Sequence, residues 1–158
     1  PSIFTDLSVE DNLRLVLQFS DLDKNEQDKR LNHLLNEFSI NHIRHSMAKH
    51  LSGGERRRTE IARTLILNPD FILLDEPFAG IDPIAVEDIQ NIIKKLKDDG
   101  IGILITDHNV RETLSITDRS YLIYDGSILK SGSSSDLAND KDVRDKYLGQ
   151  NFKLEENE

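Results

Sequence analysis

Four apolar residues in a row, Phe71-Ile72-Leu73-Leu74, stand directly before Asp75-Glu76-Pro77. Continuous apolar runs of this length are typical of parallel strands that are buried on both faces of a sheet. Apolar residues then recur at helical spacing over 84–97, and a second apolar run occupies 101–106. A strand, a helix and a second strand at this spacing form a βαβ unit. The chain is therefore predicted to have an α/β fold with a mainly parallel sheet.

The segment that precedes this unit is polar and helical. Ser8 is placed to cap a first helix, and apolar residues form one stripe along a second helix over 24–38. We therefore predict an α-helical subdomain over residues 1–50, followed by the α/β part over 51–132.

After the second strand, the pattern predicts a short helix over 109–116. Two apolar stretches then flank Asp125-Gly126, which is a strong signal for a β-hairpin turn. Residues 133–158 are expected to form short helices and an acidic tail.

The charge balance excludes some functions. The chain of 158 residues has 20 Lys and Arg against 29 Asp and Glu, so its net charge is −9. An acidic chain lacks the positive surface that non-specific nucleic-acid binding needs, so we expect no nucleic-acid partner. Because there are no cysteines, disulfides and thiolate zinc sites are excluded. The chain begins at Pro1 and its only methionine is Met47, so we expect a fragment of a longer protein.

A first motif, Leu51-Ser52-Gly53-Gly54-Glu55, opens a helix that should end at Asn68-Pro69. Ser52 and Glu55 stand at the two positions of a capping box, and two glycines let a ligand approach the backbone closely. The exposed amides at the positive end of a helix suit a phosphate group. The alternative interpretation is a well-capped helix without a ligand.

A second motif, Asp75-Glu76, follows the first strand. Ligands bind at the carboxyl ends of the strands in open α/β sheets. Asp75 suits a Mg²⁺ ion held through water, and Glu76 suits polarising a water for attack on a phosphoryl group. The alternative is a strand that ends in two solvated acids.

A third motif, Thr106-Asp107-His108, follows the second strand at the same predicted edge of the sheet. His108 could donate a hydrogen bond to a γ-phosphate or to the attacking water. The alternative is a surface histidine, and this is how we interpret the other four histidines.

Taken in order, these motifs resemble those of the ATP-binding-cassette (ABC) ATPases. Residues 51–55 are similar to the signature motif of that family, and 71–76 to its Walker B strand with the catalytic glutamate. Ala79-Gly80-Ile81-Asp82 resembles the D-loop, and His108 resembles the switch histidine. The resemblance covers essentially the whole chain. It implies an incomplete P-loop NTPase-like fold, with the helical subdomain before the signature helix and the C-terminal part of a RecA-like core after it.

The resemblance also implies cofactors and roles. ATP and Mg²⁺ would be bound between two head-to-tail subunits of a homodimer. The resemblance implies Glu76 as the general base, His108 as a γ-phosphate contact and Asp75 as the Mg²⁺ partner through water. It implies that the ATP of the opposite subunit is contacted by the signature residues Ser52, Gly53, Gly54 and Glu55. Asp82 of the D-loop would link the two sites.

Several stretches resemble one branch of the family, the ATPase subunits of bacterial lipopolysaccharide exporters. They are Gly54-Glu55-Arg56-Arg57-Arg58, residues 78–83, residues 105–114 and Tyr147-Leu148-Gly149. This branch implies a subunit on the cytoplasmic face of the inner membrane of a Gram-negative bacterium, where it drives inner-membrane permease subunits. We interpret Arg56 to Arg58 as a solvated helix face that pairs with nearby acids.

The resemblance also implies that the segment before the helical subdomain receives the permease, which makes Phe4 and Leu7 candidates for docking it. Both precede a helical hairpin that already has an apolar core of its own, so at least one of them should be partly exposed. The alternative is that both pack against the neighbouring helices.

One departure from the family pattern affects activity. None of the 8 glycines is followed by lysine, so the 158 residues contain no Gly-Lys-Ser/Thr phosphate loop. The family's Q-loop glutamine, expected just before Pro1, is absent as well. We therefore expect this chain to be inactive alone and the full-length protein to be an ATPase. Other readings are an amino-acid importer's ATPase, a soluble cassette ATPase that acts on DNA or ribosomes, and an inert folded fragment.

Overall fold

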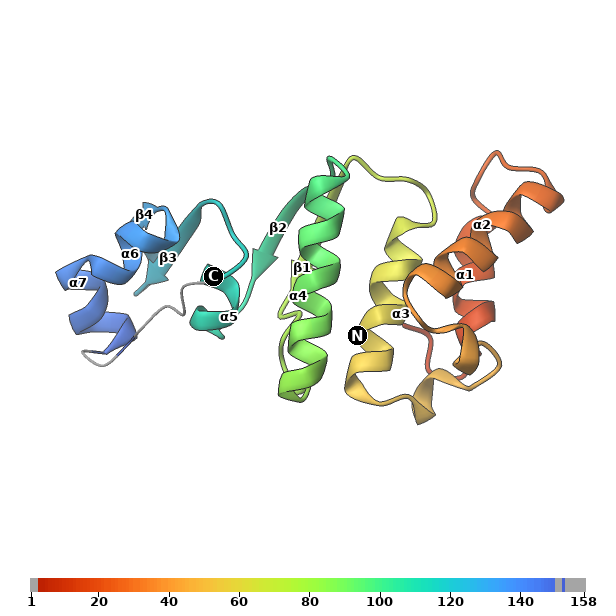
Figure 1. Ribbon diagram of the computed structural model, residues 1–158, viewed down its shortest axis with the longest axis horizontal. Helices are drawn as coiled ribbons and strands as arrows, with labels where there is room; N and C mark the ends of the chain where they lie inside the picture. The colour runs from red at the N-terminus through yellow and green to blue at the C-terminus, as the bar shows by residue number, and fades with distance from the viewer. Residues whose placement is uncertain (1–2, 150–151, 153–158) are drawn as a thin grey trace.

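A computed structural model describes residues 3–149 and 152 of the chain (Figure 1). Three groups of elements follow one another along its longest axis: a helical group, a βαβ unit, and a hairpin with short helices. No helix in the described part of the chain combines the length and the apolarity that crossing a bilayer requires.

The helical group contains α1 (Val9–Leu17), α2 (Lys24–Glu37) and α3 (Gly53–Leu65). Two short 3₁₀ turns, η1 (Asn41–Ile43) and η2 (Ala48–His50), lie between α2 and α3. Helix α1 packs against both α2 and α3. The predicted stripe on the second helix is buried here, and the core of this group includes Leu13, Leu17, Leu31, Leu34, Leu35, Phe38 and Ile61.

The predicted βαβ unit is present as β1 (Phe71–Asp75), α4 (Pro83–Asp98) and β2 (Gly102–Thr106). The two strands pair in parallel, with Phe71 opposite Gly102 and Asp75 opposite Thr106. Helix α4 buries Ala85, Ile89, Ile93 and Leu96 and packs against α3 as well as the sheet. This packing joins the βαβ unit and the helical group in one hydrophobic core.

The prediction that both strands are buried on both faces is wrong for this chain. Ile72 is 1% exposed, whereas Phe71 and Leu73 are 67% and 73% exposed and Leu104 is 53% exposed. The side chains of a strand alternate between the two faces of a sheet. Ile72 belongs to the main core and α4 covers that face, whereas the face that carries Phe71 and Leu73 has no comparable cover among the described residues.

The last group is built on the hairpin of β3 (Ser120–Tyr124) and β4 (Ser127–Gly132), which turns at Asp125-Gly126 as predicted. Its other elements are α5 (Val110–Leu114), α6 (Ser134–Asn139), α7 (Lys141–Val143) and a π-helical turn, η3 (Arg144–Leu148). A second, smaller core is formed by Leu114, Leu122, Leu137 and Val143. The predicted acidic tail over 155–158 lies outside the described residues.

The helix caps follow the sequence closely at the N-terminal ends. The Ser8 hydroxyl accepts the Asp11 N–H at 3.0 Å, as the pattern predicts.

Two helix lengths differ from the prediction. The sequence predicts a helix that runs to Leu67, directly before Asn68-Pro69, but Leu65 is the last helical residue of α3, so its predicted end is wrong by two residues. Asn68 has a positive φ of 48°, a backbone conformation that asparagine tolerates better than most residues. The predicted helix over 109–116 is also shorter, since α5 covers only Val110–Leu114.

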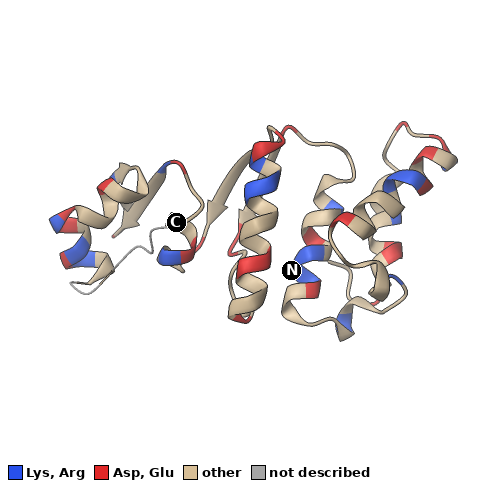
Figure 2. Ribbon diagram, viewed as in Figure 1, with Lys and Arg blue, Asp and Glu red and all other residues tan. Residues whose placement is uncertain are grey.

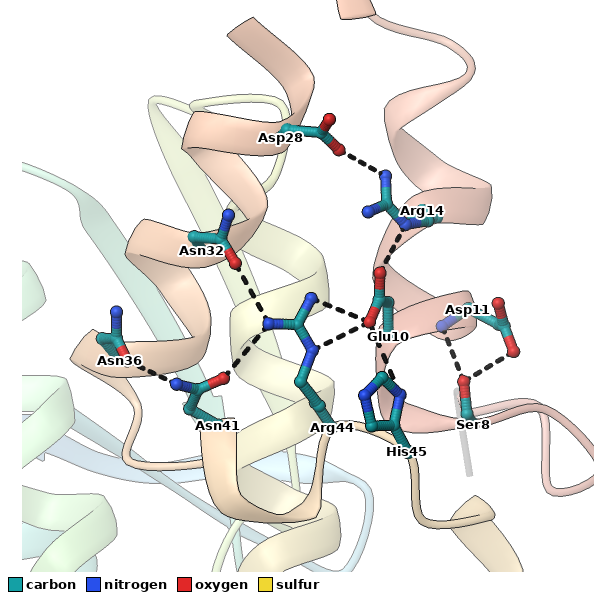
Figure 3. A network of polar contacts seen from close by, with 10 residues as sticks. All are labelled: Ser8, Glu10, Asp11, Arg14, Asp28, Asn32, Asn36, Asn41, Arg44 and His45. Carbon is teal, nitrogen blue, oxygen red and sulfur yellow. Dashed lines mark hydrogen bonds and ion pairs between the residues drawn. The ribbon is translucent and has the colours of Figure 1, made fainter. Parts of the chain in front are cut away.

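A polar network holds α1, α2 and the turn after η1 together (Figure 3). The Glu10 carboxylate binds Arg14 at 2.7 Å on its own helix and Arg44 at 2.8 Å from the turn. Arg14 also binds Asp28 of α2 at 2.7 Å, and Arg44 donates to Asn32 of α2 at 3.2 Å. Burial alone raises the pKa of Glu10, but the hydrogen bonds and positive charges of the two arginines outweigh this effect, so its pKa lies below the ordinary value.

Replacing Glu10 with Gln should therefore destabilise the helical group by about 1 to 2 kcal/mol at neutral pH, because charge-assisted hydrogen bonds are lost. A carboxyl group whose folded-state pKa is lowered stabilises the fold fully above its unfolded pKa. The difference between wild type and E10Q should thus be full above pH 4.5 and decrease as pH falls through the lower, folded-state pKa. Urea unfolding across this pH range measures it. Glu87→Gln, an exposed change on α4, is the control, and an E10Q effect that does not depend on pH would contradict the prediction.

Candidate active site

The structure brings Glu76 and His108 together at one edge of the sheet. Because β1 and β2 are parallel, the residues that follow the two strands leave the sheet on the same side. The Glu76 N–H donates to the Thr106 carbonyl at 2.7 Å, which extends the pairing by one residue. Nδ1 of His108 then lies 3.4 Å from Oε1 of Glu76. Both side chains are more than half exposed, so both are available to a ligand.

The backbone of Glu76 is held in an unusual conformation. Its φ is +46°, a region that L-residues other than asparagine and aspartate seldom adopt. The Glu76 carbonyl accepts hydrogen bonds from the Ala79 N–H at 3.1 Å and from Nη2 of Arg57 at 2.9 Å. Such strained positions persist where the surroundings over-determine them, and they cluster at functional sites.

Asp75 offers the oxygen chemistry that Mg²⁺ prefers. Its Oδ1 accepts a hydrogen bond from the Thr106 hydroxyl at 2.5 Å, and the residue is exposed. Within residues 3–149 and 152, no group of three or more acidic or imidazole side chains surrounds a metal position. The donor set therefore fits a Mg²⁺ ion that keeps its waters and takes further oxygens from phosphates, rather than an all-protein cage.

The predicted phosphate motif forms the first turn of α3. Ser52 and Glu55 make the complete capping box: the Ser52 hydroxyl accepts the Glu55 N–H at 3.3 Å, and the Glu55 carboxylate accepts the Ser52 N–H at 2.8 Å. The hydrogen bond from the Ser52 backbone, and then that from its hydroxyl, hold the pKa of Glu55 below its ordinary value. Gly53 and the Ser52 side chain remain exposed at the helix end.

The two glycines of this motif also pack closely within the chain. A Cβ on Gly53 would lie 2.9 Å from Cγ2 of Ile81, and a Cβ on Gly54 would lie 2.8 Å from Cβ of Ala85. The start of α3 therefore touches both the loop before α4 and α4 itself. Gly54 is buried, and the close packing of α3 on α4 is enough to explain why this position is glycine. This explanation does not depend on a ligand at Gly53.

Asp82 begins α4. Its carboxylate accepts the Ala85 N–H at 3.0 Å, so it is the N-cap of that helix, and the residue is exposed. A cleft of about 760 Å³ separates α3 from the end of β1 and the loop before α4. Its lining includes Gly53, Arg57, Glu60, Asp75, Glu76 and Ile81, so residues of three of the predicted motifs share one cleft.

The interpretation of Arg56 to Arg58 as a solvated face needs correction. Arg57 pairs with Glu60 at 2.9 Å and Arg58 pairs with Asp88 of α4 at 3.0 Å, as expected of nearby acids. The two arginine side chains are, however, only 23% and 17% exposed. They are covered because α3 packs against α4 and the end of β1, a contact that periodicity alone does not reveal. Elsewhere Lys and Arg are interleaved with Asp and Glu along the helices (Figure 2).

Phe4 and Leu7 belong to the segment before α1. The buried amide of Asn12 holds their segment: Phe4 N–H donates to Oδ1 of Asn12 at 2.9 Å, and Nδ2 of Asn12 donates to the Phe4 carbonyl at 3.0 Å. The Phe4 ring is 48% exposed, as predicted for at least one of the pair, and Leu7 is partly buried. The Arg63 guanidinium of α3 lies 4.9 Å from the centre of the Phe4 ring.

Three residues with structural roles at the site were not assigned from the sequence. Asp107 and Thr106 stand inside a recognised motif, but nothing in the pattern says what they contact. Arg57 stands beside the signature-like motif, and only the fold brings it to the Glu76 backbone. All three act through contacts between residues at least 19 apart in the chain, for which local spacing gives no signal.

Comparison with known sequences decides the family. The sequence profile of the ABC transporter family matches residues 1–79, half of the chain. The chain belongs to the ABC transporter ATPase family. This confirms the resemblance drawn from the motifs and the α/β fold predicted with it.

Related proteins agree with this assignment. An uncharacterised ABC transporter ATP-binding protein of Rhizobium meliloti is 56% identical over 153 residues, which is 97% of this chain and 57% of that protein. The lipopolysaccharide export system ATP-binding protein LptB of Escherichia coli K12 is 54% identical over 154 residues, which is 97% of this chain and 64% of LptB. The chain thus spans less than two thirds of the length of these relatives.

Solved structures give the same result for the fold. A crystal structure of an ATP-binding cassette of an ABC transporter in its ADP conformation superposes with a TM-score of 0.78 at 28% identity. The superposition covers 92% of this chain and 64% of the cassette. The arrangement of helical group, βαβ unit and hairpin is therefore that of part of an ABC cassette.

Proposed function

We propose that this ABC ATPase chain belongs to the subunit that binds and hydrolyses ATP to power lipopolysaccharide export. The observation that carries the proposal is 54% identity to LptB over 97% of the chain. The contact between Glu76 and His108 at the sheet edge supports the catalytic part, because it joins a general base to a hydrogen-bonding imidazole.

In this proposal, Glu76 is the general base and accepts a proton from the attacking water. His108, 3.4 Å away, donates a hydrogen bond to the γ-phosphate and keeps the Glu76 carboxylate oriented. Asp75 holds Mg²⁺ through water, with Thr106 fixing one carboxylate oxygen. When bound, Mg²⁺ neutralises charge on the phosphate oxygens. The chain's own contribution is therefore positioning and charge, the usual mode of phosphoryl-transfer catalysis.

The remaining motif residues act across a homodimer. Ser52, Gly53, Gly54 and Glu55 form the signature contacts to the ATP bound by the second subunit, with the exposed first turn of α3 facing the phosphates. Asp82, exposed at the start of α4, links the two sites as the D-loop acid. The close contact of Gly53 with Ile81 supports this arrangement, because it places the signature and D-loop segments side by side.

The proposed partners are inner-membrane permease subunits of a Gram-negative bacterium, which the ATPase meets on the cytoplasmic face. The test is reconstitution. The intact protein is assembled with lipopolysaccharide exporter permeases in proteoliposomes, and ATP-dependent lipopolysaccharide release is measured. Release that requires ATP supports the proposal. Assembly with amino-acid importer permeases instead would overturn the proposed cargo while leaving the ATPase assignment intact.

The 158-residue chain alone is expected to release no phosphate from ATP above a Glu76→Gln background. Its residues include no Gly-Lys-Ser/Thr loop, and without that loop there is no amide cradle and no lysine for the β- and γ-phosphates. Malachite-green phosphate release measures this, with the intact protein as the positive control. Clear turnover by the 158-residue chain would refute the prediction.

Phe4→Ala is expected to weaken assembly with the permease. Phe4 is half exposed, and Asn12 holds its backbone in place; exposed aromatic rings in ordered segments are common interface anchors. Co-purification of intact ATPase with permease subunits measures the effect. Phe19→Ala, which removes a ring that is 78% exposed in the turn after α1, is the matched control. Normal co-purification of F4A together with a lowered melting temperature would show that Phe4 serves the fold instead.

A further inference from the structure

Asp107 differs in burial from every other candidate at the sheet edge. Its side chain is 0% exposed, whereas those of its neighbours Glu76 and His108 are 56% and 66% exposed. An ionised carboxylate is costly to bury unless hydrogen-bond donors satisfy it. The donors that satisfy Asp107 therefore indicate what the residue does.

The two oxygens of Asp107 bind different segments of the chain. Oδ2 accepts the Phe78 backbone N–H at 3.0 Å, across 29 residues of sequence. Oδ1 accepts the Asn109 backbone N–H at 2.7 Å and the Asn109 side-chain amide at 2.9 Å. One carboxylate thus connects the loop after β1 to the loop after β2 through charge-assisted hydrogen bonds, which are stronger than neutral ones.

These two loops carry the reactive pair. Phe78 lies two residues after Glu76, and Asp107 directly precedes His108. The contact between Nδ1 of His108 and Oε1 of Glu76, at 3.4 Å, is longer than a strong hydrogen bond. Because both side chains are exposed and this direct contact is weak, their separation depends on how firmly the two loops are held to each other.

We propose that Asp107 is a positioning residue, whose buried carboxylate joins the loops after β1 and β2 and thereby holds His108 against Glu76. The inference rests on the proposed ATPase function of Glu76 and His108 and adds a residue to it. Asp107 touches neither substrate nor metal in this proposal, and it acts on turnover only through His108.

The test is a double-mutant cycle in the intact protein with Asp107→Asn, His108→Ala and the combination. Asparagine has the same shape but only one oxygen acceptor, which should stay with the two donors of Asn109, so the Phe78 N–H loses its acceptor. We expect D107N to lower kcat by about 10- to 100-fold, because displacing a catalytic group by about 1 Å has an effect of this size. The affinity for ATP should be retained. In the H108A background, D107N should have little further effect. Asp140→Asn is the matched control, since Asp140 likewise accepts a backbone N–H, that of Val143 at 3.1 Å, in the C-terminal helices.

A second readout does not depend on activity. Hydrogen exchange of the Phe78 amide should become faster in D107N and stay unchanged in D140N, because only D107N removes its acceptor. If D107N does not fold, Asn109→Ala replaces it. That change removes one donor to Oδ1, and we expect kcat to fall by about 2- to 10-fold, again without effect in the H108A background.

The outcomes separate the two proposals. Two outcomes would overturn the positioning role alone. One is wild-type turnover in a folded D107N variant. The other is a D107N effect of equal size with and without His108. An intact wild-type protein that shows no turnover above Glu76→Gln overturns the ATPase function, and the positioning role with it.

Discussion

Glu76→Gln in the intact protein is expected to lower kcat by about 10²- to 10⁴-fold, the usual effect of removing a general base. Glutamine keeps the size of the side chain and the backbone bonds to Thr106, Ala79 and Arg57, so the site should stay assembled. ATP should remain bound, because the change removes a proton acceptor and no phosphate contact. Steady-state phosphate release and equilibrium ATP binding measure the two parts.

Glu87→Gln, on the exposed face of α4, is the matched control for E76Q and should leave both measurements unchanged. Retained turnover in the E76Q variant would show that another group takes the proton. Turnover and ATP binding lost together would point to a collapsed site instead of a missing base.

Gly54→Ala is expected to destabilise the fold by about 1 to 3 kcal/mol, the usual cost of adding a methyl group to a close-packed contact. The added Cβ would lie 2.8 Å from Cβ of Ala85, and neither atom can move without moving α3 or α4. Thermal or urea unfolding of the intact protein measures the loss.

The second change that tests this explanation is Ala85→Gly. If helix packing is the reason for Gly54, the G54A/A85G double variant should recover most of the stability that G54A loses, after allowing for the lower helix propensity of glycine. A double variant that remains as unstable as G54A would contradict the packing explanation. Turnover that stays low after stability recovers would show that the position also serves the bound phosphate.

Local rules predicted the elements of this fold well. The apolar run before Asp75, the helix over 84–97 and the run over 101–106 became β1, α4 and β2, and Ser52 and Glu55 formed their capping box as expected. Strand pairing then brought Glu76 and His108 to one edge, which the parallel arrangement alone implies. These features depend on neighbours in sequence or on one rule of sheet geometry.

What could not be predicted depends on contacts between distant segments. An apolar run indicates a strand but does not say which face is covered, and so the exposure of Leu73 came only from the fold. The helix position of Arg57 predicts a solvated side chain, because it gives no information about the contact with the residue after β1. The motif 106–108 gives no role for Asp107, since its partner Phe78 is 29 residues away.

The backbone of Glu76 bears on how this position can change during evolution. At a φ of +46°, glycine or asparagine would fit at lower conformational energy than glutamate. Selection for folding alone would therefore favour replacing Glu76. A related protein that no longer hydrolyses ATP should lose this carboxylate early and become more stable. Under the proposed role of Glu76, selection for hydrolysis keeps glutamate at this position against selection for stability, an opposition that keeps natural proteins below their stability optimum.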